Sequence, residues 1–130
     1  MGAVKYISAK DMGYTNPAHR SEAVVTPEGM VFVSGQIGAD PVTKEQPDNM
    51  YEQATRAFKT VEEIVKKAGG SKDDIIKLDI YITDRDLGSD VSKARAEFFT
   101  GTPPTAAFVY DCDIAAGAML EVVATAYIST

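Results

Sequence analysis

A capped amphipathic helix over residues 49–68 places the strongest constraint on this fold. Seven apolar side chains recur at spacings of three and four residues, the period of a helix with one buried face. They are Ala54, Ala57, Phe58, Val61, Ile64, Val65 and Ala68. Asn49 is a suitable N-cap with Glu52 three residues on, and Gly69-Gly70 supplies a left-handed stop. A helix with one apolar face needs a second layer to pack on.

Strand patterns lie on both sides of this helix and predict that layer. Residues 23–26 and 30–34 favour strands, and the turn sequence Pro27-Glu28-Gly29 joins them. The second of these strands is apolar at four successive positions, which predicts burial on both of its faces. Residues 76–82 alternate apolar and polar, as a half-buried strand does, with Ile76 on the apolar side. Residues 105–110 and 118–128 are two further strands, and residues 4–8 are a weak first one.

A second helix is predicted over residues 89–99, with Val91, Ala94 and Phe98 on one face and Pro103-Pro104 beyond its end. This order of elements predicts an α+β fold, a mixed sheet with two helices packed on one face. The other face is too apolar to stay in water, so an oligomer is expected. We interpret residues 1–130 as one domain because no linker or repeat interrupts the pattern.

Composition excludes several classes of function. The net charge is −6, from 13 basic and 19 acidic residues, which disfavours nucleic-acid and acidic-membrane binding. The chain has no apolar run of signal-peptide or membrane-span length. Cys112 is the only cysteine, so no disulfide forms within the chain, and a reducing, cytoplasmic location is expected. His19 is the only histidine, so no metal site built on clustered histidines is expected.

Several segments, taken together and in order, resemble the RidA/YjgF family of enamine/imine deaminases, which is also described as endoribonuclease L-PSP-like. The resemblance covers nearly the whole chain. The segments are Val31-Phe32-Val33-Ser34-Gly35-Gln36-Ile37, Gln53 to Gly70, Asp73 to Lys77, Tyr81 to Asp84, Ala96 to Phe99, Pro103, and Glu121 within an apolar strand.

This resemblance implies a chorismate-mutase-like fold and a homotrimer whose sheets form a central barrel. It also implies ligand pockets in the clefts between subunits. The implied chemistry is hydrolysis of an enamine or imine with release of ammonia, without a metal or organic cofactor. The expected partners are therefore a small-molecule substrate and two further copies of the chain.

The family's key arginine is missing. In the family, an arginine after the proline near the fifth main strand clamps the substrate carboxylate, and here Thr105 stands there. A glutamate on the last strand is thought to position the attacking water, and Glu121 matches it. We therefore expect Glu121 as the catalytic residue. The residues expected to bind substrate are Ser34, Arg20 (at the family's pocket tyrosine), Ser92 (at its pocket asparagine), Thr105 and Ala107.

Three of these residues also have an explanation that involves no function. Glu121 could point to solvent from an edge strand, Ser34 could hydrogen-bond backbone at a strand end, and Arg20 could be a solvated surface residue. The leading hypothesis is a deaminase whose substrate differs from that of arginine-bearing members. The alternatives are a non-catalytic trimer that binds a metabolite as a sensor or interaction module, and a chaperone-like or translation-associated role.

Overall fold

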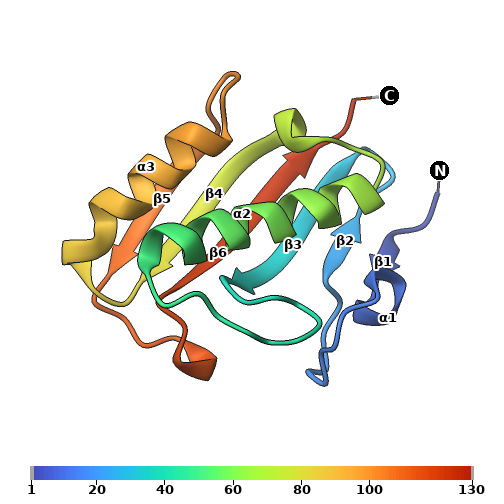
Figure 1. Cartoon of the computed structure of the whole chain (residues 1–130). Coiled ribbons are helices and arrows are strands. Elements are labelled where there is room, and N and C mark those ends of the chain that lie inside the picture. The colour runs from blue at the N-terminus through green and yellow to red at the C-terminus, as the bar shows by residue number, and fades with distance from the viewer. Residues whose placement is uncertain (1, 130) are drawn as a thin grey trace.

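A computed structural model describes residues 2–129. Within them the strands form one six-stranded sheet in the order β1-β2-β3-β6-β4-β5 (Figure 1). The elements are β1 (Lys5–Ile7), α1 (Ala9–Met12), β2 (Ala23–Val25), β3 (Met30–Ile37), α2 (Met50–Lys67), β4 (Ile75–Ile82), α3 (Gly88–Phe98), β5 (Thr105–Tyr110) and β6 (Leu120–Tyr127).

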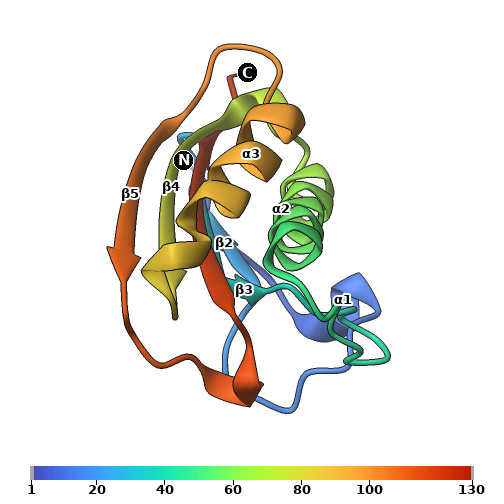
Figure 2. The same ribbon diagram turned by 60° about the vertical axis from the view of Figure 1, so that its left-hand side comes forward.

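The sheet is mixed, as the sequence predicted. β5 runs parallel to β4, and the other neighbouring strands are antiparallel. A parallel pair needs a crossover connection, and α3 supplies it between β4 and β5. Helices α2 and α3 cover the same face of the sheet (Figure 2). The predicted α+β fold with two helices on one face is therefore confirmed.

The core lies between these helices and the sheet. The Asn49 side chain accepts a hydrogen bond of 2.9 Å from the backbone N–H of Glu52 and so begins α2 as predicted. Phe58 is fully buried on α2, and its ring lies 5.9 Å from that of Phe98 and 5.5 Å from that of Phe99. Burial of one such side chain contributes roughly 1.5–3 kcal/mol. This packing fixes α2 against the strands that carry the site.

Gly38 allows the end of β3 to approach α2 closely. A Cβ atom at Gly38 would lie 2.3 Å from the carbonyl oxygen of Gln53, so only glycine fits there without moving the helix. The Gln53 side chain also accepts a hydrogen bond of 3.0 Å from the backbone N–H of Met119, just before β6. These contacts hold the loop after β3 and the start of β6 beside the first turns of α2.

The opposite face of the sheet is uncovered in a single chain. Four of its side chains are Tyr6, Phe32, Val109 and Tyr127, which are 66%, 48%, 44% and 45% exposed. Phe32 therefore differs from the prediction that residues 30–34 are buried on both faces. An apolar surface of this kind is expected to bind another protein surface.

Two local features differ from the sequence prediction. Helix α1 was not predicted, because four residues are too few to show helical periodicity. A capping box between Ser8 and Asp11 forms it. The pairing of β4 with β6 shifts register between Ile75 and Lys77, so Ile75 is buried and Ile76 is 45% exposed. The expected inward position of Ile76 is wrong for this reason.

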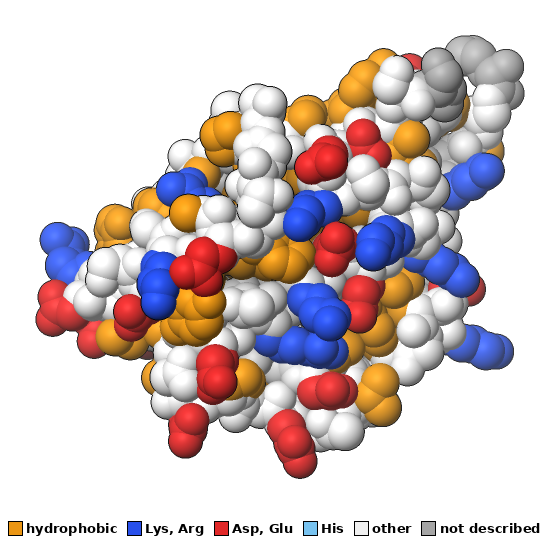
Figure 3. Space-filling model, turned by 45° about the horizontal axis from the view of Figure 1, so that its top comes forward, with side chains coloured by type: hydrophobic (Ala, Val, Ile, Leu, Met, Phe, Trp, Pro, Cys, Tyr) orange, Lys and Arg blue, Asp and Glu red, His pale blue; other side chains and the backbone are white. Residues whose placement is uncertain are grey.

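The face shown in Figure 3 carries acidic and basic side chains close to one another, with no broad area of basic charge. None of the helices within residues 2–129 has the length and hydropathy required to cross a membrane.

Candidate functional site

A pocket of about 220 Å³ lies where the loops before β2 and after β3 meet the start of β6. Six of the residues that line it carry the argument below: Arg20, Glu22, Gly35, Asp40, Lys44 and Glu121.

Glu121 lies on a central strand and lines this pocket. Its neighbours Leu120 and Val122 are buried against the helices, so the Glu121 side chain points the other way. It pairs with Ile37 on β3 and with Tyr81 on β4. The explanation that Glu121 points to solvent from an edge strand is therefore wrong.

Gly35 makes room for the Glu121 carboxylate. A Cβ atom at Gly35 would lie 2.6 Å from both the carboxyl carbon and Oε2 of Glu121. The carboxylate therefore lies directly against the β3 backbone, at the register shift between Val33 and Gln36. This contact gives the carboxylate a defined position in the pocket.

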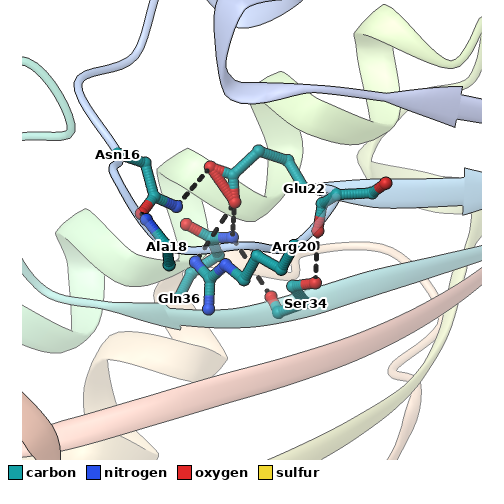
Figure 4. Close-up of polar contacts among 7 residues, drawn as sticks. Asn16, Ala18, Arg20, Glu22, Ser34 and Gln36 are labelled. Atoms are coloured by element: carbon teal, nitrogen blue, oxygen red, sulfur yellow. Dashed lines mark hydrogen bonds and ion pairs between the residues drawn. The ribbon is translucent and has the colours of Figure 1, made fainter.

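Glu22 is a second pocket carboxylate, and sequence analysis missed it. Its side chain is buried, and its oxygens accept hydrogen bonds of 3.1 Å from Arg20, 3.3 Å from Gln36 Nε2 and 3.2 Å from Asn16 Nδ2 (Figure 4). A buried charge is costly without such partners. The sequence around Glu22 gives no signal of its burial, because an acidic residue just before an apolar strand is usually a solvated loop residue.

Arg20 lines the pocket but is already paired. Its guanidinium forms an ion pair of 3.1 Å with Glu22, and its side chain is 38% exposed. Arg20 is therefore an exposed residue, as its alternative explanation has it, and its charge is paired with Glu22.

Ser34 has the structural role that was its alternative explanation. Its hydroxyl donates a hydrogen bond of 2.7 Å to the carbonyl oxygen of Ser21, and its own carbonyl accepts one of 3.1 Å from Gln36 Nε2. Ser34 thus fastens the loop that carries Arg20 and Glu22 to β3 (Figure 4). It is not among the residues that line the pocket.

The other three expected substrate-binding residues lie elsewhere in the same chain. Thr105 and Ala107 are exposed on the edge strand β5, and Ser92 is half-buried on α3. The Thr105 hydroxyl donates a hydrogen bond of 3.1 Å to the carbonyl oxygen of Ile76. Strand β4 separates β5 from β6, a distance of roughly 10 Å at ordinary strand spacing. One chain therefore does not bring these residues together with Glu121.

Two further polar groups shape the pocket wall. The Tyr14 hydroxyl donates a hydrogen bond of 3.0 Å to Glu63, and burial together with this bond raises the pKa of Tyr14. Backbone N–H groups of Thr43 and Val42 lower the pKa of the Asp40 carboxyl. Within residues 2–129, no three His, Cys, Asp or Glu side chains are grouped so that they could hold a metal ion.

The fold and the pocket place this chain among α+β proteins of the YjgF type. Residues 15–128 match the Endoribonuclease L-PSP family, and the chain belongs to that family, which is the RidA/YjgF family that its segments resemble. Membership in the family rests on a match over nearly all of the chain and not on any single residue.

Relatives and solved structures agree with this assignment. TdcF of Escherichia coli, whose name describes a reactive intermediate deaminase, is 36% identical over 100 residues, which are 75% of this chain and 78% of TdcF. A 2-iminobutanoate/2-iminopropanoate deaminase of Mus musculus is 28% identical over 74% of this chain and 72% of its own. The structure of Escherichia coli TdcF with bound serine superimposes with a TM-score of 0.81, at 30% identity, over 99% of this chain and 100% of TdcF.

Proposed function

We propose that this protein hydrolyses an imine, or an enamine after its tautomerisation, to a carbonyl compound and ammonia at the pocket that contains Glu121. The observation that carries this proposal is the Glu121 carboxylate itself. It lies against Gly35 in a pocket, and within residues 2–129 no hydrogen bond or ion pair engages it. Relatives named as reactive intermediate and imine deaminases support the same reaction class.

The Glu121 carboxylate acts as general base and then as general acid. A water oxygen bonds to the carbon of the protonated imine, the C=N π electrons move to nitrogen, and Glu121 takes a proton from the water. Glu121 then returns this proton to the amino nitrogen. The C–N bond breaks, ammonia leaves, and the hydroxyl group becomes the carbonyl as it loses its proton. The net reaction is imine plus water to carbonyl compound plus ammonia.

The complete site requires a homotrimer in this proposal. The open sheet face and the exposed edge strand β5 are available to a neighbouring copy, which would bring its Ser92, Thr105 and Ala107 segments to the cleft. Such an assembly would place these segments near a pocket that one chain leaves incomplete. The serine bound to TdcF shows that this related protein holds a small ligand.

Glu121→Gln tests the chemistry because it keeps the shape of the side chain and removes the base. The expected result is a fall in kcat of about 100-fold or more, the usual contribution of a positioned general base. Ammonia release from a panel of freshly generated imines and enamines measures it. Glu62→Gln, a change of the same charge in α2 at a residue that does not line the pocket, should keep wild-type turnover. Unchanged kcat in a correctly assembled Glu121→Gln protein would reject this role.

A non-catalytic metabolite-binding trimer is the second candidate function. One observation favours it: Thr105, which the family resemblance aligns with the arginine, donates its hydroxyl to the backbone carbonyl of Ile76. In this case small ligands bind the pocket, and ammonia release from every imine in the panel stays at the uncatalysed rate.

A further inference from the structure

The charge of Arg20 is paired with the buried carboxylate of Glu22. Glu22 is 1% exposed, and one of its carboxylate oxygens accepts hydrogen bonds from both Arg20 and Gln36. Asn16 donates to the other oxygen and so fixes the plane of the carboxylate. The carboxylate of this pair is shielded from solvent, whereas the Arg20 side chain is 38% exposed, so water screens the pair in part and the hydrogen-bonded contact holds it.

The remaining charges of the pocket do not favour an anion either. Its lining carries three carboxylates, on Glu22, Asp40 and Glu121, against two cations, on Arg20 and Lys44. Arg56, at 3.8 Å, pairs with Asp40 as Arg20 pairs with Glu22. Glu121 is thus the lining carboxylate that no cation within residues 2–129 pairs with, and Lys44 lies exposed on the rim in a turn with φ of 70°. A substrate carboxylate beside Arg20 would therefore approach Glu22 and Glu121. Like charges placed together in a binding site oppose association.

We infer that the substrate of this site carries no carboxylate on its reacting carbon. This inference rests on the proposed function and names the substrate class for it, an uncharged imine or its protonated iminium form. The unpaired Glu121 carboxylate attracts the positive iminium, which is the species that water attacks. Glu22 is then a specificity-determining residue, because it pairs with Arg20, the arginine that lines this pocket within residues 2–129.

A matched pair of substrates tests the inference. 2-Iminopropanoate carries a carboxylate, and 2-iminopropanamide has the same shape with an uncharged carboxamide. For the wild-type protein we expect kcat/KM to be about tenfold or more higher for the amide, since like charges placed together in a site cost that much or more. Glu22→Gln leaves the Arg20 charge unbalanced and should shift this ratio toward the carboxylate by about the same factor. Adding Arg20→Ala to Glu22→Gln should reverse the shift.

Glu62→Gln is the matched control, because it removes one negative charge outside the pocket and should leave the substrate ratio unchanged. If Glu22→Gln does not fold, the wild-type comparison still decides the inference. A wild-type kcat/KM equal or higher for 2-iminopropanoate overturns it. A Glu22→Gln protein that folds and keeps the wild-type ratio overturns the role of Glu22.

Binding of the two products separates this inference from the proposed function. Calorimetry with pyruvate and pyruvamide needs no turnover, and pyruvamide should bind the wild-type protein more tightly. If pyruvamide binds more tightly but ammonia release from both imines stays at the uncatalysed rate, the inference that the site binds uncharged ligands is supported. The proposed deaminase function is then rejected. Tighter binding of pyruvate, or no binding of pyruvamide, overturns the inference whatever the turnover.

Discussion

At the residue scale, the position of Glu121 depends on the absence of a Cβ atom at Gly35. Gly35→Ala should displace the Glu121 carboxylate, because the added Cβ would lie 2.6 Å from its carboxyl carbon. The side chain can swing away, so we expect the fold to survive with a change in melting temperature of a few degrees at most. The kcat for imine hydrolysis should fall by about tenfold or more, since misplacement of a catalytic group by 1 Å costs that or more.

Gly101→Ala is the matched control for that substitution. The nearest atom to its added Cβ is a carboxylate oxygen of Asp73 at 3.2 Å, in a loop away from the pocket. Its turnover should equal that of the wild-type protein. A Gly35→Ala protein with wild-type kcat would show that the carboxylate does not need its place against β3.

Glu121 and Glu22 differ in how far the sequence could predict them. Glu121 interrupts an apolar strand and matches a family position, so one stretch of sequence is sufficient to single it out. Glu22 has no such pattern, because its partners Asn16, Arg20 and Gln36 come from a loop and from β3. Their meeting depends on the pairing of β2 with β3, which tertiary contacts decide. Ser34 is expected to bind substrate from the family resemblance, and in the structure its hydroxyl donates a hydrogen bond to the Ser21 carbonyl oxygen.

At the element scale, local signals were sufficient for α2 and insufficient for β4. The cap, the periodicity and the glycine stop of α2 are all contained in residues 49–70, so its bounds could be predicted closely. The first residues of β4 depend on a register shift at Ile75–Lys77 in their pairing with β6, and this reversed the expected orientation of Ile76. Patterns within one segment do not contain such cross-strand information.

The contact between the loop after α1 and helix α2 gives a prediction about pH. Burial first, and then the hydrogen bond to Glu63, raises the pKa of Tyr14 above its ordinary value of 10.0. The folded state therefore holds the phenol proton more tightly than the unfolded state does. This contribution to stability is complete below about pH 10 and is lost as the pH rises toward the folded-state pKa.

Tyr14→Phe removes this linkage. Between pH 10 and 11.5 the free energy of unfolding should fall less steeply in Tyr14→Phe than in the wild-type protein. Near pH 8 the variant should be less stable by about 1 kcal/mol, the usual contribution of one hydrogen bond. Urea unfolding at several pH values measures both effects. Parallel alkaline slopes in the two proteins would contradict the prediction.

At the scale of the whole molecule, the expected site residues fall into two groups that one chain keeps apart. Arg20 and Glu121 line the pocket, whereas Thr105 and Ala107 lie across β4 on the edge strand. The sequence could indicate both groups through family resemblance, but the distance between them is a property of the assembled molecule. The uncovered sheet face, which carries Phe32 near its centre, is the surface through which we expect copies to meet.

The last prediction concerns this assembly. The wild-type protein should scatter light as a stable homotrimer at micromolar concentration, with three times the 13.9 kDa mass of one chain. Phe32→Asp should convert it to monomers, because association would bury a charge without a partner on the open face. Val42→Asp introduces the same charge at a similarly exposed residue, 53% exposed in the loop before α2, and should leave the trimer intact. If the wild-type protein is a monomer, the proposed cleft between subunits does not form. If Phe32→Asp is still a trimer, the interface lies on another surface. If the site needs a neighbouring copy, ammonia release should be lost together with the trimer in Phe32→Asp and retained in Val42→Asp.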